Sequence, residues 1–359
     1  MTPKSKPVFR RPEFGARIIS VGTAVPPKKY TQNEVLDLYH EQDRRIRKIF
    51  LGGNIETRHL YLPEPSNGQM PVESNQELID KHLNGVLELG PKAITECLSP
   101  LGLAPYDVDF FCCISSTGFL CPGISAHLVN KMRFRENVQR SDILGMGCNA
   151  GLNGLQAVSA FTRSNPGKKA LLLCTEICSA AYVYNKSVNV AVVNSLFGDG
   201  VAAVLVCQDN ENFLDGPIIF DFESHIIVEA LGAMKFELDG TKLSFYLDRD
   251  IPYVIGANVE KPLGRLLGRH GLKRRDIAHW VIHSGGKKVI DAIEYNIGLT
   301  DYDVRHTLNI LRNYGNLSSA AFLFSYKELM REDIVKKGDV GVAITMGPGT
   351  TIETALLIW

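Results

Sequence analysis

The strongest constraint on the fold of this chain is a short internal repeat. Residues 102–108 (Gly-Leu-Ala-Pro-Tyr-Asp-Val) and 271–277 (Gly-Leu-Lys-Arg-Arg-Asp-Ile) share the pattern Gly-Leu-x-x-x-Asp-aliphatic, and each leads into an apolar run. After each aspartate, a later residue follows a glycine and precedes an apolar helix. The spacing from the aspartate to this residue is nearly the same in both places, 41 positions to Cys148 and 40 to Asn316. We therefore expect two duplicated halves, in which Cys148 and Asn316 occupy equivalent helix starts that face a common pocket.

A second correspondence between the halves is looser. Residues 198–200 (Gly-Asp-Gly) and 338–340 (Gly-Asp-Val) each precede a strand-like run. The composition becomes loop-like after Asp209, with several asparagines, a glycine and a proline. We place the boundary there, which gives an N-terminal half, 1–209, and a C-terminal half, 210–359.

Strand and helix patterns alternate along the chain. Thr31 and Glu34 have the spacing of a capping box, which opens a helix expected to continue to about Asp43. Hydrophobic patterns predict three buried strands at 108–116, 170–176 and 277–283, and one long helix at 78–101. This alternation is typical of the α/β class.

One cysteine stands in a setting suited to chemistry. Within residues 142–153 an apolar run ends at Gly145 and Gly147, and Cys148 then opens a segment of helical periodicity. This pattern predicts a strand, a tight turn and a helix with the thiol at its N-terminus, where free N–H groups and the helix dipole favour a thiolate. Most free cysteines are only small buried hydrophobic residues, so the case for Cys148 depends on its partners.

Two polar residues of the second half are candidates for those partners. His283 ends a predicted strand just before two glycines, and ligands bind at the carboxyl ends of strands in α/β sheets. Its plainer interpretation is a hydrogen-bonded structural histidine. Asn316 lies in residues 313–319 (Asn-Tyr-Gly-Asn-Leu-Ser-Ser), where a helix N-cap is the plainer interpretation. An N-cap role and a catalytic role are compatible.

Cysteine, histidine and asparagine together allow two chemistries. One is acyl transfer, with a Cys148 thiolate paired ionically with His283 and with His283 and Asn316 as oxyanion donors. The other is a papain-like protease, which has the same chain order and a similar Cys-to-His spacing. Against the protease, the Cys-Gly-Ser/Ala-Cys-aromatic signature is missing, a secretory segment is not expected, and the duplication is unexplained.

The composition excludes several partner classes. Lys+Arg and Asp+Glu both number 39, so neither nucleic acid nor an anionic membrane is expected as a partner. No apolar run approaches the roughly 20 residues of a membrane helix. The eight cysteines include no CxxC pair and no zinc-like spacing, so we expect no metal, reduced thiols and a cytoplasmic location.

A basic cluster follows the first predicted helix. It includes Arg44, Arg45, Arg47 and Lys48, with Arg58 not far behind. Such a cluster could bind a phosphorylated carrier such as coenzyme A, and Arg47 and Arg58 are our candidates. A solvated helix face is an equally good interpretation.

Four motifs resemble the type III polyketide synthases of the thiolase fold, over nearly the whole chain. They are residues 147–151, 282–286, 313–319 and the terminal Gly-Pro-Gly at 347–349. Long strings are most similar to members that serve antibiotic pathways. The resemblance implies a five-layered αβαβα fold of two α/β halves, a homodimer, and no cofactor beyond the coenzyme A thioesters used as substrates.

The resemblance also implies residue roles. Cys148 would carry the acyl chain, while His283 and Asn316 would bind the malonyl-CoA thioester and promote its decarboxylation. Phe197 and Phe245 match gatekeeper positions between the coenzyme A tunnel and the pocket, although core packing is the plainer interpretation of Phe245. Three further residues match positions that shape the pocket, namely Cys178, Ala181 and Ser318. The first two replace threonines of plant members, so a phenylpropanoid starter is not expected.

The expected function is decarboxylative condensation of several malonyl-CoA units and closure to a resorcinol-type aryl-CoA. Accessory dehydratase-type enzymes are possible partners. Two alternatives stay open on the sequence alone. One is an acyl-carrier-protein-dependent ketosynthase, and the other is a non-catalytic protein of the same fold that binds acyl-CoA.

Overall fold

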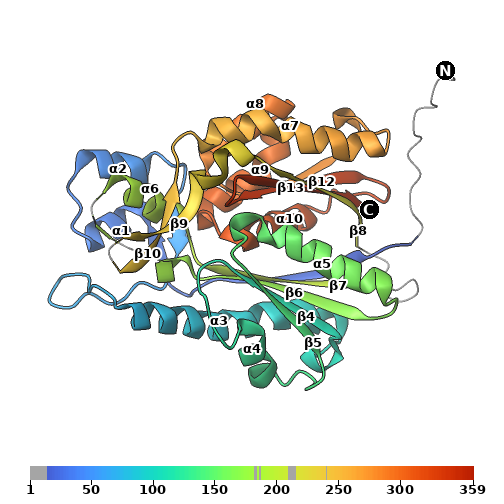
Figure 1. The fold of residues 1–359 in the computed structure, drawn as a ribbon, viewed down its shortest axis with the longest axis horizontal. Coiled ribbons are helices and arrows are strands. Elements are labelled where there is room, and N and C mark those ends of the chain that lie inside the picture. Colours follow the sequence, from blue (N-terminus) through green and yellow to red (C-terminus); the bar gives the residue numbers. More distant parts are fainter. Residues whose placement is uncertain (1–13, 182–183, 186, 209–215, 240) are drawn as a thin grey trace.

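A nine-stranded mixed sheet runs through the protein (Figure 1), in a computed structural model that describes all residues except 1–13, 182–183, 186, 209–215 and 240. Its strand order is β11-β12-β13-β8-β1-β7-β6-β4-β5. The first half contributes β1 (Arg17–Ala24), β4 (Phe110–Ser115), β5 (Gln139–Leu144), β6 (Lys169–Glu176) and β7 (Gly200–Cys207). The second half contributes β8 (Ile218–Ile226), β11 (His279–Ile282), β12 (Val340–Gly347) and β13 (Thr351–Ile358).

The sheet shows the duplication directly. The series β4-β6-β7-β1 and the series β11-β12-β13-β8 both begin with a parallel pair and continue with two antiparallel pairs. The two series meet at one residue pair, Arg17 with Ile218. Among the described strands, β5 has no counterpart in the second half. The predicted boundary at 209/210 lies outside the described residues, so the division into 1–209 and 210–359 remains our proposal.

Sheet topology corrects the looser sequence correspondence. β12 pairs in parallel with β11 as β6 does with β4, so β12 is the equivalent of β6. Residues 338–340 therefore lead into the equivalent of β6, whereas residues 198–200 lead into β7. The prediction that these two segments are equivalent is wrong, because a Gly-Asp turn can precede a strand of either direction.

The repeated heptapeptide folds the same way in both places. Gly102 and Gly271 have φ angles of 66° and 67°, a left-handed conformation that glycine adopts at little cost. In each copy the aspartate carboxylate accepts the backbone N–H three residues earlier at 2.8 Å. The resulting 3₁₀ turns, η2 (Pro105–Asp107) and η6 (Arg274–Asp276), lead to β4 and β11. The strongest sequence signal of duplication is thus confirmed.

Helices and half-sheets alternate in five layers, as predicted (Figure 1). α3 (Asn75–Leu98) and α4 (Ile124–Met132) cover the outer face of the first half-sheet. α5 (Ala150–Ser164) and α10 (Ala321–Arg331) form the middle layer. α7 (Ile251–Arg269) and α8 (Lys287–Ile297) cover the outer face of the second half-sheet, and α9 (Asp301–Tyr314) packs beside α8, α10 and β11. Both faces of each half-sheet are covered, which explains the continuous apolar strands.

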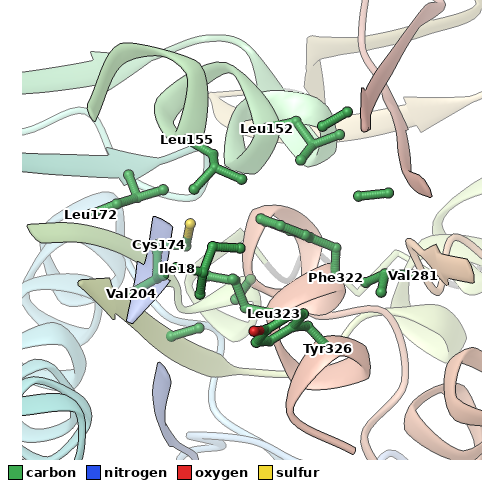
Figure 2. Close-up of a cluster of buried hydrophobic side chains, with 14 of the residues drawn as sticks. Ile18, Leu152, Leu155, Leu172, Cys174, Val204, Val281, Phe322, Leu323 and Tyr326 are labelled. Atoms are coloured by element: carbon green, nitrogen blue, oxygen red, sulfur yellow. The ribbon is translucent and has the colours of Figure 1, made fainter. Parts of the chain in front are cut away.

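The middle layer holds a core shared by both halves. Figure 2 shows Leu152 and Leu155 of α5 opposite Phe322 and Leu323 of α10, with strand residues around them. A Cβ on Gly151 would lie 2.4 Å from the Ser319 carbonyl oxygen, so only glycine permits this approach of the two helices. The contact brings the equivalent helix starts of the two halves together.

A smaller group of elements covers one end of the sheets (Figure 1, left). It consists of α1 (Gln32–Leu38), α2 (Arg44–Leu51), α6 (Val188–Leu196), β2 (Lys29–Thr31), β3 (Thr57–His59), β9 (Met234–Asp239) and β10 (Lys242–Leu247). The capping box of Thr31 and Glu34 is confirmed, but α1 ends at Leu38 rather than near Asp43, because His40 has a φ of 49° and cannot continue the helix. The long helix predicted at 78–101 is α3.

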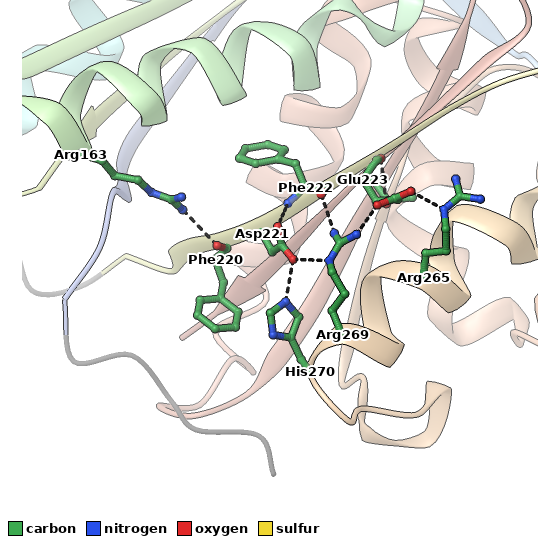
Figure 3. A network of polar contacts seen from close by, with 9 residues as sticks. Arg163, Phe220, Asp221, Phe222, Glu223, Arg265, Arg269 and His270 are labelled. Atoms are coloured by element: carbon green, nitrogen blue, oxygen red, sulfur yellow. Dashed lines mark hydrogen bonds and ion pairs between the residues drawn. The ribbon is translucent and has the colours of Figure 1, made fainter. Parts of the chain in front are cut away.

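Ion pairs fix α7 over β8 (Figure 3). Asp221 binds His270 at 2.7 Å and Arg269 at 3.0 Å, and Glu223 pairs with both Arg269 and Arg265. This network joins two elements of the second half. Both of its carboxylates are paired with basic side chains, so we do not consider it a ligand site. Within the described part of the chain, no helix is long and apolar enough to cross a membrane.

Candidate active site

Cys148 lies at the start of α5, as the sequence predicted. The chain leaves β5 and makes the 3₁₀ turn η3 (Gly147–Asn149), and α5 follows directly. Gly147 has a φ of 70°, and a Cβ there would lie 2.1 Å from Pro348 Cδ. The turn is therefore pressed against the Gly-Pro-Gly loop at 347–349, and Cys148 is only 8% exposed.

His283 and Asn316 are buried and held by their own backbones. The His283 N–H donates to the Ile344 carbonyl at 2.9 Å, which extends β11 by one residue toward the site. The Asn316 N–H donates to the Leu196 carbonyl at 2.9 Å. The Asn316 Oδ1 accepts the Ser318 N–H at 2.8 Å. Because Oδ1 is occupied, the amide Nδ2 is the group left to donate to the sulfur or to a substrate.

All three residues line one cavity of about 510 Å³. A second cavity of about 40 Å³, which we call the chamber, lies on the other side of Cys148 and contains Cys178, Ala181 and Ser318 in its wall. Phe197 and Phe245 line both spaces, and their rings meet edge to face at 5.6 Å. The structure therefore gathers every predicted catalytic and pocket residue around the Cys148 thiol.

Comparisons with known proteins identify the family. The family model "FAE1/Type III polyketide synthase-like protein" matches residues 57–216, and "Chalcone and stilbene synthases, C-terminal domain" matches 222–358. The chain is 49% identical to a 3,5-dihydroxyphenylacetyl-CoA synthase of Streptomyces toyocaensis, over 96% of this chain and 90% of that protein. It is 47% identical to the protein of that name from Amycolatopsis orientalis, over 96% and 93%. The chain belongs to the type III polyketide synthases.

Solved structures agree on the fold of the synthase. PKS-I of Ectocarpus siliculosus superimposes with a TM-score of 0.89 at 22% identity, covering 97% of this chain and 99% of that one. The 1,3,6,8-tetrahydroxynaphthalene synthase of Streptomyces coelicolor superimposes with a TM-score of 0.86 at 24% identity, covering 96% and 99%. The thiolase fold is confirmed, and the papain-like alternative is excluded.

Burial shifts the pKa values of both titratable groups at the site of the synthase. It raises the pKa of Cys148 to about 12, with hydrogen bonds from Ser318 and Asn316 acting in the opposite direction. Burial also lowers the pKa of His283 to about 3. Burial thus favours the neutral forms of the Cys148 thiol and the His283 imidazole, and the thiolate–imidazolium pair stays a prediction.

A buried carboxyl group near the thiol was missed by sequence reasoning. Glu176 ends β6, is fully buried, and accepts the Ser116 N–H at 3.0 Å and the Ser319 hydroxyl at 2.5 Å. Burial raises its pKa to about 7, although these hydrogen bonds lower it. The negative charge of its ionised form raises the pKa of Cys148. The signal available in the sequence was a glutamate at the end of an apolar, strand-like run.

Asp199 holds the chamber wall of the synthase in place. Its buried carboxylate accepts the Ser179 N–H at 2.7 Å, the Ser179 hydroxyl at 2.6 Å and the Tyr61 N–H at 2.8 Å. Ser179 is the neighbour of Cys178, and Asp199 lies two residues after Phe197. The Asp199 carboxylate thus links the turn that contains Cys178 to the segment that contains Phe197, one of the two predicted gatekeepers.

The expectation that Arg58 binds coenzyme A is wrong. Arg58 is 0% exposed, and its guanidinium donates to the carbonyls of Asn194 (2.6 Å) and Phe197 (2.7 Å) and to Gln32 Oε1 (2.7 Å). It thereby caps the C-terminal end of α6. A cluster of basic residues in the sequence does not show which of the side chains point into the protein.

Arg47 lies on α2 and donates to the Glu41 carbonyl at 3.1 Å. It is not among the residues that line the cavity of about 510 Å³. Two other cations do line that cavity: Arg249, whose side chain is 93% exposed, and Lys288 near the start of α8. The role of Arg47 stays a prediction, and sequence reasoning missed the other two because neither lies in a basic cluster. In the described residues, no group of three or more His, Cys, Asp or Glu side chains is placed to hold a metal ion.

Proposed function

We propose that this synthase makes 3,5-dihydroxyphenylacetyl-CoA from malonyl-CoA alone. The acyl part of that product has eight carbon atoms, which is four two-carbon units. Four malonyl-CoA would give one product, four carbon dioxide, three coenzyme A and one water. The observation that carries the proposal is the convergence of Cys148, His283 and Asn316 on one cavity, in a chain about half identical to synthases of that name.

In the proposed acyl loading, His283 acts as the base for the Cys148 thiol. As the Cys148 sulfur attacks the thioester carbon, its proton passes to the His283 imidazole, and the leaving coenzyme A thiolate then takes a proton. Cys148 is held in a turn that α5 and the Gly-Pro-Gly loop fix from two sides. This placement costs no rearrangement at the moment of reaction.

Decarboxylation needs donors at the thioester oxygen of the incoming malonyl-CoA. Loss of carbon dioxide leaves an enolate, whose oxygen carries the new negative charge. The imidazole N–H of His283 and the Nδ2 of Asn316 are two such donors, on side chains that are only 1% and 3% exposed. Removing one preorganised donor typically costs about 10²–10³ in rate. The enolate carbon then attacks the acyl group on Cys148, which lengthens the chain by two carbons.

The two spaces beside Cys148 have different tasks in this scheme. Coenzyme A occupies the cavity of about 510 Å³, with Arg249 and Lys288 as partners for its phosphates. The growing chain passes Phe197 and Phe245 into the chamber. There Cys178 and Ala181 present sulfur and methyl groups. Ring closure by an intramolecular aldol step, with loss of one water, completes the product.

A homodimer is the proposed assembly. β5 is an edge strand of the sheet, with unpaired backbone groups on one side. Next to it Leu144 and Met146 are 40% and 36% exposed. Ile226 and Leu231 of the second half, 48% and 55% exposed, flank the Gly-Pro-Gly loop that Gly147 touches. A second copy would cover this apolar surface. All eight cysteines are free, which supports the proposed cytoplasmic location.

Mass spectrometry of products from malonyl-CoA as sole substrate tests the proposal. The purified protein should release an aryl-CoA with the mass of the dihydroxyphenylacetyl thioester, and Cys148→Ala should release none while staying folded. A product with another carbon number would overturn the proposed chain length. A hydrated, non-aromatic eight-carbon thioester would instead assign the loss of water to a dehydratase-type partner.

A further inference from the structure

The two proposed oxyanion donors lie on separate elements of the second half. His283 directly follows β11, and Asn316 is the second residue after α9. Their own backbone N–H groups bond Ile344 of β12 and Leu196 of α6, so neither bond ties one donor to the other. Two donors stabilise one enolate oxygen only when both stand at the right distance from it. The separation of His283 and Asn316 therefore needs a structural cause.

The first link between the two elements is a buried threonine of α9. The Thr307 hydroxyl donates to the Ile282 carbonyl, at the end of β11, at 2.9 Å. Because Thr307 is 0% exposed, no bulk water competes for this bond. A longer bond of 3.4 Å reaches the same carbonyl from the Ser325 hydroxyl of α10. The end of β11 is thus fastened to α9 one residue before His283.

The second link joins the residue after His283 to the residue before Asn316. The Ser284 hydroxyl donates to the Gly315 carbonyl at 3.3 Å, and the Ser284 side chain is also 0% exposed. Gly315 is itself held by α9, because its N–H donates to the Leu311 carbonyl at 3.0 Å. The two links therefore lie on either side of His283, and the second one ends beside Asn316.

Neither hydroxyl group faces the substrate. Among the described residues that line the cavity of about 510 Å³ and the chamber, neither Ser284 nor Thr307 is found. Each hydroxyl donates to a backbone carbonyl, which is a contact that orients the main chain. An effect of these side chains on the chemistry would therefore pass through the residues that they hold in place.

We propose that Ser284 and Thr307 are positioning residues, which set the separation of His283 and Asn316 so that both donate to the same enolate oxygen. The inference rests on the proposed role of these two donors in decarboxylation. A displacement of about 1 Å in a reacting geometry can cost about 10²-fold in rate. Because each variant below removes one link and keeps the other, we expect a smaller loss of about 10-fold.

The rate of carbon dioxide release from malonyl-CoA tests the proposal. Ser284→Ala should lower kcat about 10-fold and leave KM within about twofold, because no contact with the cavity is lost. Thr307→Val keeps the shape of the side chain, removes the donor and should act in the same direction. Ser159→Ala is the matched control. Ser159 is 1% exposed and its hydroxyl has no partner among the described residues, so kcat should stay at the wild-type value.

A double-mutant cycle separates positioning from a general loss of structure. Once Asn316→Ala has removed one donor, Ser284 has no separation left to set. In that background, Ser284→Ala should change the rate of decarboxylation by less than about twofold. A remaining loss of about 10-fold there would overturn the proposal. A wild-type kcat for both Ser284→Ala and Thr307→Val would overturn it as well. Urea unfolding of each variant shows whether a lost rate reflects a lost fold.

The outcomes keep this inference apart from the proposed function. If wild type releases carbon dioxide but forms another product, the proposed product fails, and the cycle still decides the positioning. If the expected product forms while Ser284→Ala and Thr307→Val decarboxylate at the wild-type rate, the inference fails and the proposed function stands. The absence of carbon dioxide release by wild type would overturn both.

Discussion

Replacing Arg58 with methionine is expected to destabilise the synthase and to leave coenzyme A binding unchanged. Methionine keeps most of the side-chain length but supplies no donor. The carbonyls of Asn194 and Phe197 and the side chain of Gln32 would each lose a bond of 2.6–2.7 Å. Hydrogen bonds to charged groups contribute about 1.5–3 kcal/mol each. Because these three share one guanidinium, we expect a combined loss of about 3–5 kcal/mol.

Urea unfolding and steady-state kinetics together measure this effect. The free energy of unfolding should fall by the stated amount, and the KM for malonyl-CoA should stay within about twofold of wild type at a temperature where the variant is folded. Arg47→Met is the matched control: its partly exposed side chain bonds one carbonyl, so we expect a loss below about 1 kcal/mol. Arg249→Met should show the reverse pattern, with a raised KM and unchanged stability.

One result would refute the structural role of Arg58. If Arg58→Met unfolds at the wild-type urea concentration but needs far more malonyl-CoA for half-maximal rate, the side chain reaches the substrate. The sequence-based expectation would then be right, and the buried placement wrong. If Arg58→Met loses both stability and affinity for malonyl-CoA, Arg58→Lys distinguishes the two roles. Lysine retains the charge but not the forked geometry that serves two carbonyls at once.

Further predictions concern charge, chemistry and packing. Glu176→Gln should lower the pKa of Cys148, so iodoacetamide alkylation should begin at lower pH; an unchanged profile would contradict the coupling. The folded protein holds the Glu176 proton up to about pH 7, whereas the unfolded chain releases it near pH 4.5, so this group's contribution to the free energy of unfolding should fall by about 3 kcal/mol across that interval. The glutamine variant should lack that slope in urea titrations. His283→Ala should slow malonyl-CoA decarboxylation by about 10²–10³, and a wild-type rate of carbon dioxide release would remove it from the scheme. Gly151→Ala should cost about 1–3 kcal/mol and reduce turnover by separating two helix starts. Gly264→Ala, in open space on α7, should be neutral or stabilising, and a similar loss there would point to a general intolerance of substitution.

Sequence patterns predicted the features that depend on local geometry. The two heptapeptides specified a glycine with positive φ and an aspartate closing a 3₁₀ turn, so their agreement in structure follows from chemistry within seven residues. The Cys148 turn was predictable for the same reason. Its pKa was not, because burial comes from side chains far away in the chain. The prediction for Arg58 failed for the same reason. Two of its partners lie more than 130 positions along the chain, and the third lies on α1.

The contact between two aromatic rings in the β9–β10 hairpin could not be foreseen either. It depends on the register that places Phe236 opposite Phe245 in the hairpin. A shift of one residue would turn both rings to the other face. Lys288 and Arg249 were missed because the cavity mouth is built from two separate segments, the start of α8 and the turn before α7, and neither residue lies in a local pattern that indicates a binding site.

The shared middle layer has an evolutionary consequence. Leu155 from one half and Phe322 from the other complete the same core, so neither half has a closed interior by itself. An ancestor with a single copy could have formed this layer only by pairing with an identical chain. Such a pair would carry the same residue at both helix starts, two thiols or two amides. Joining the copies in one gene released that symmetry, and allowed one helix to specialise in holding the acyl group while its twin specialised in stabilising charge.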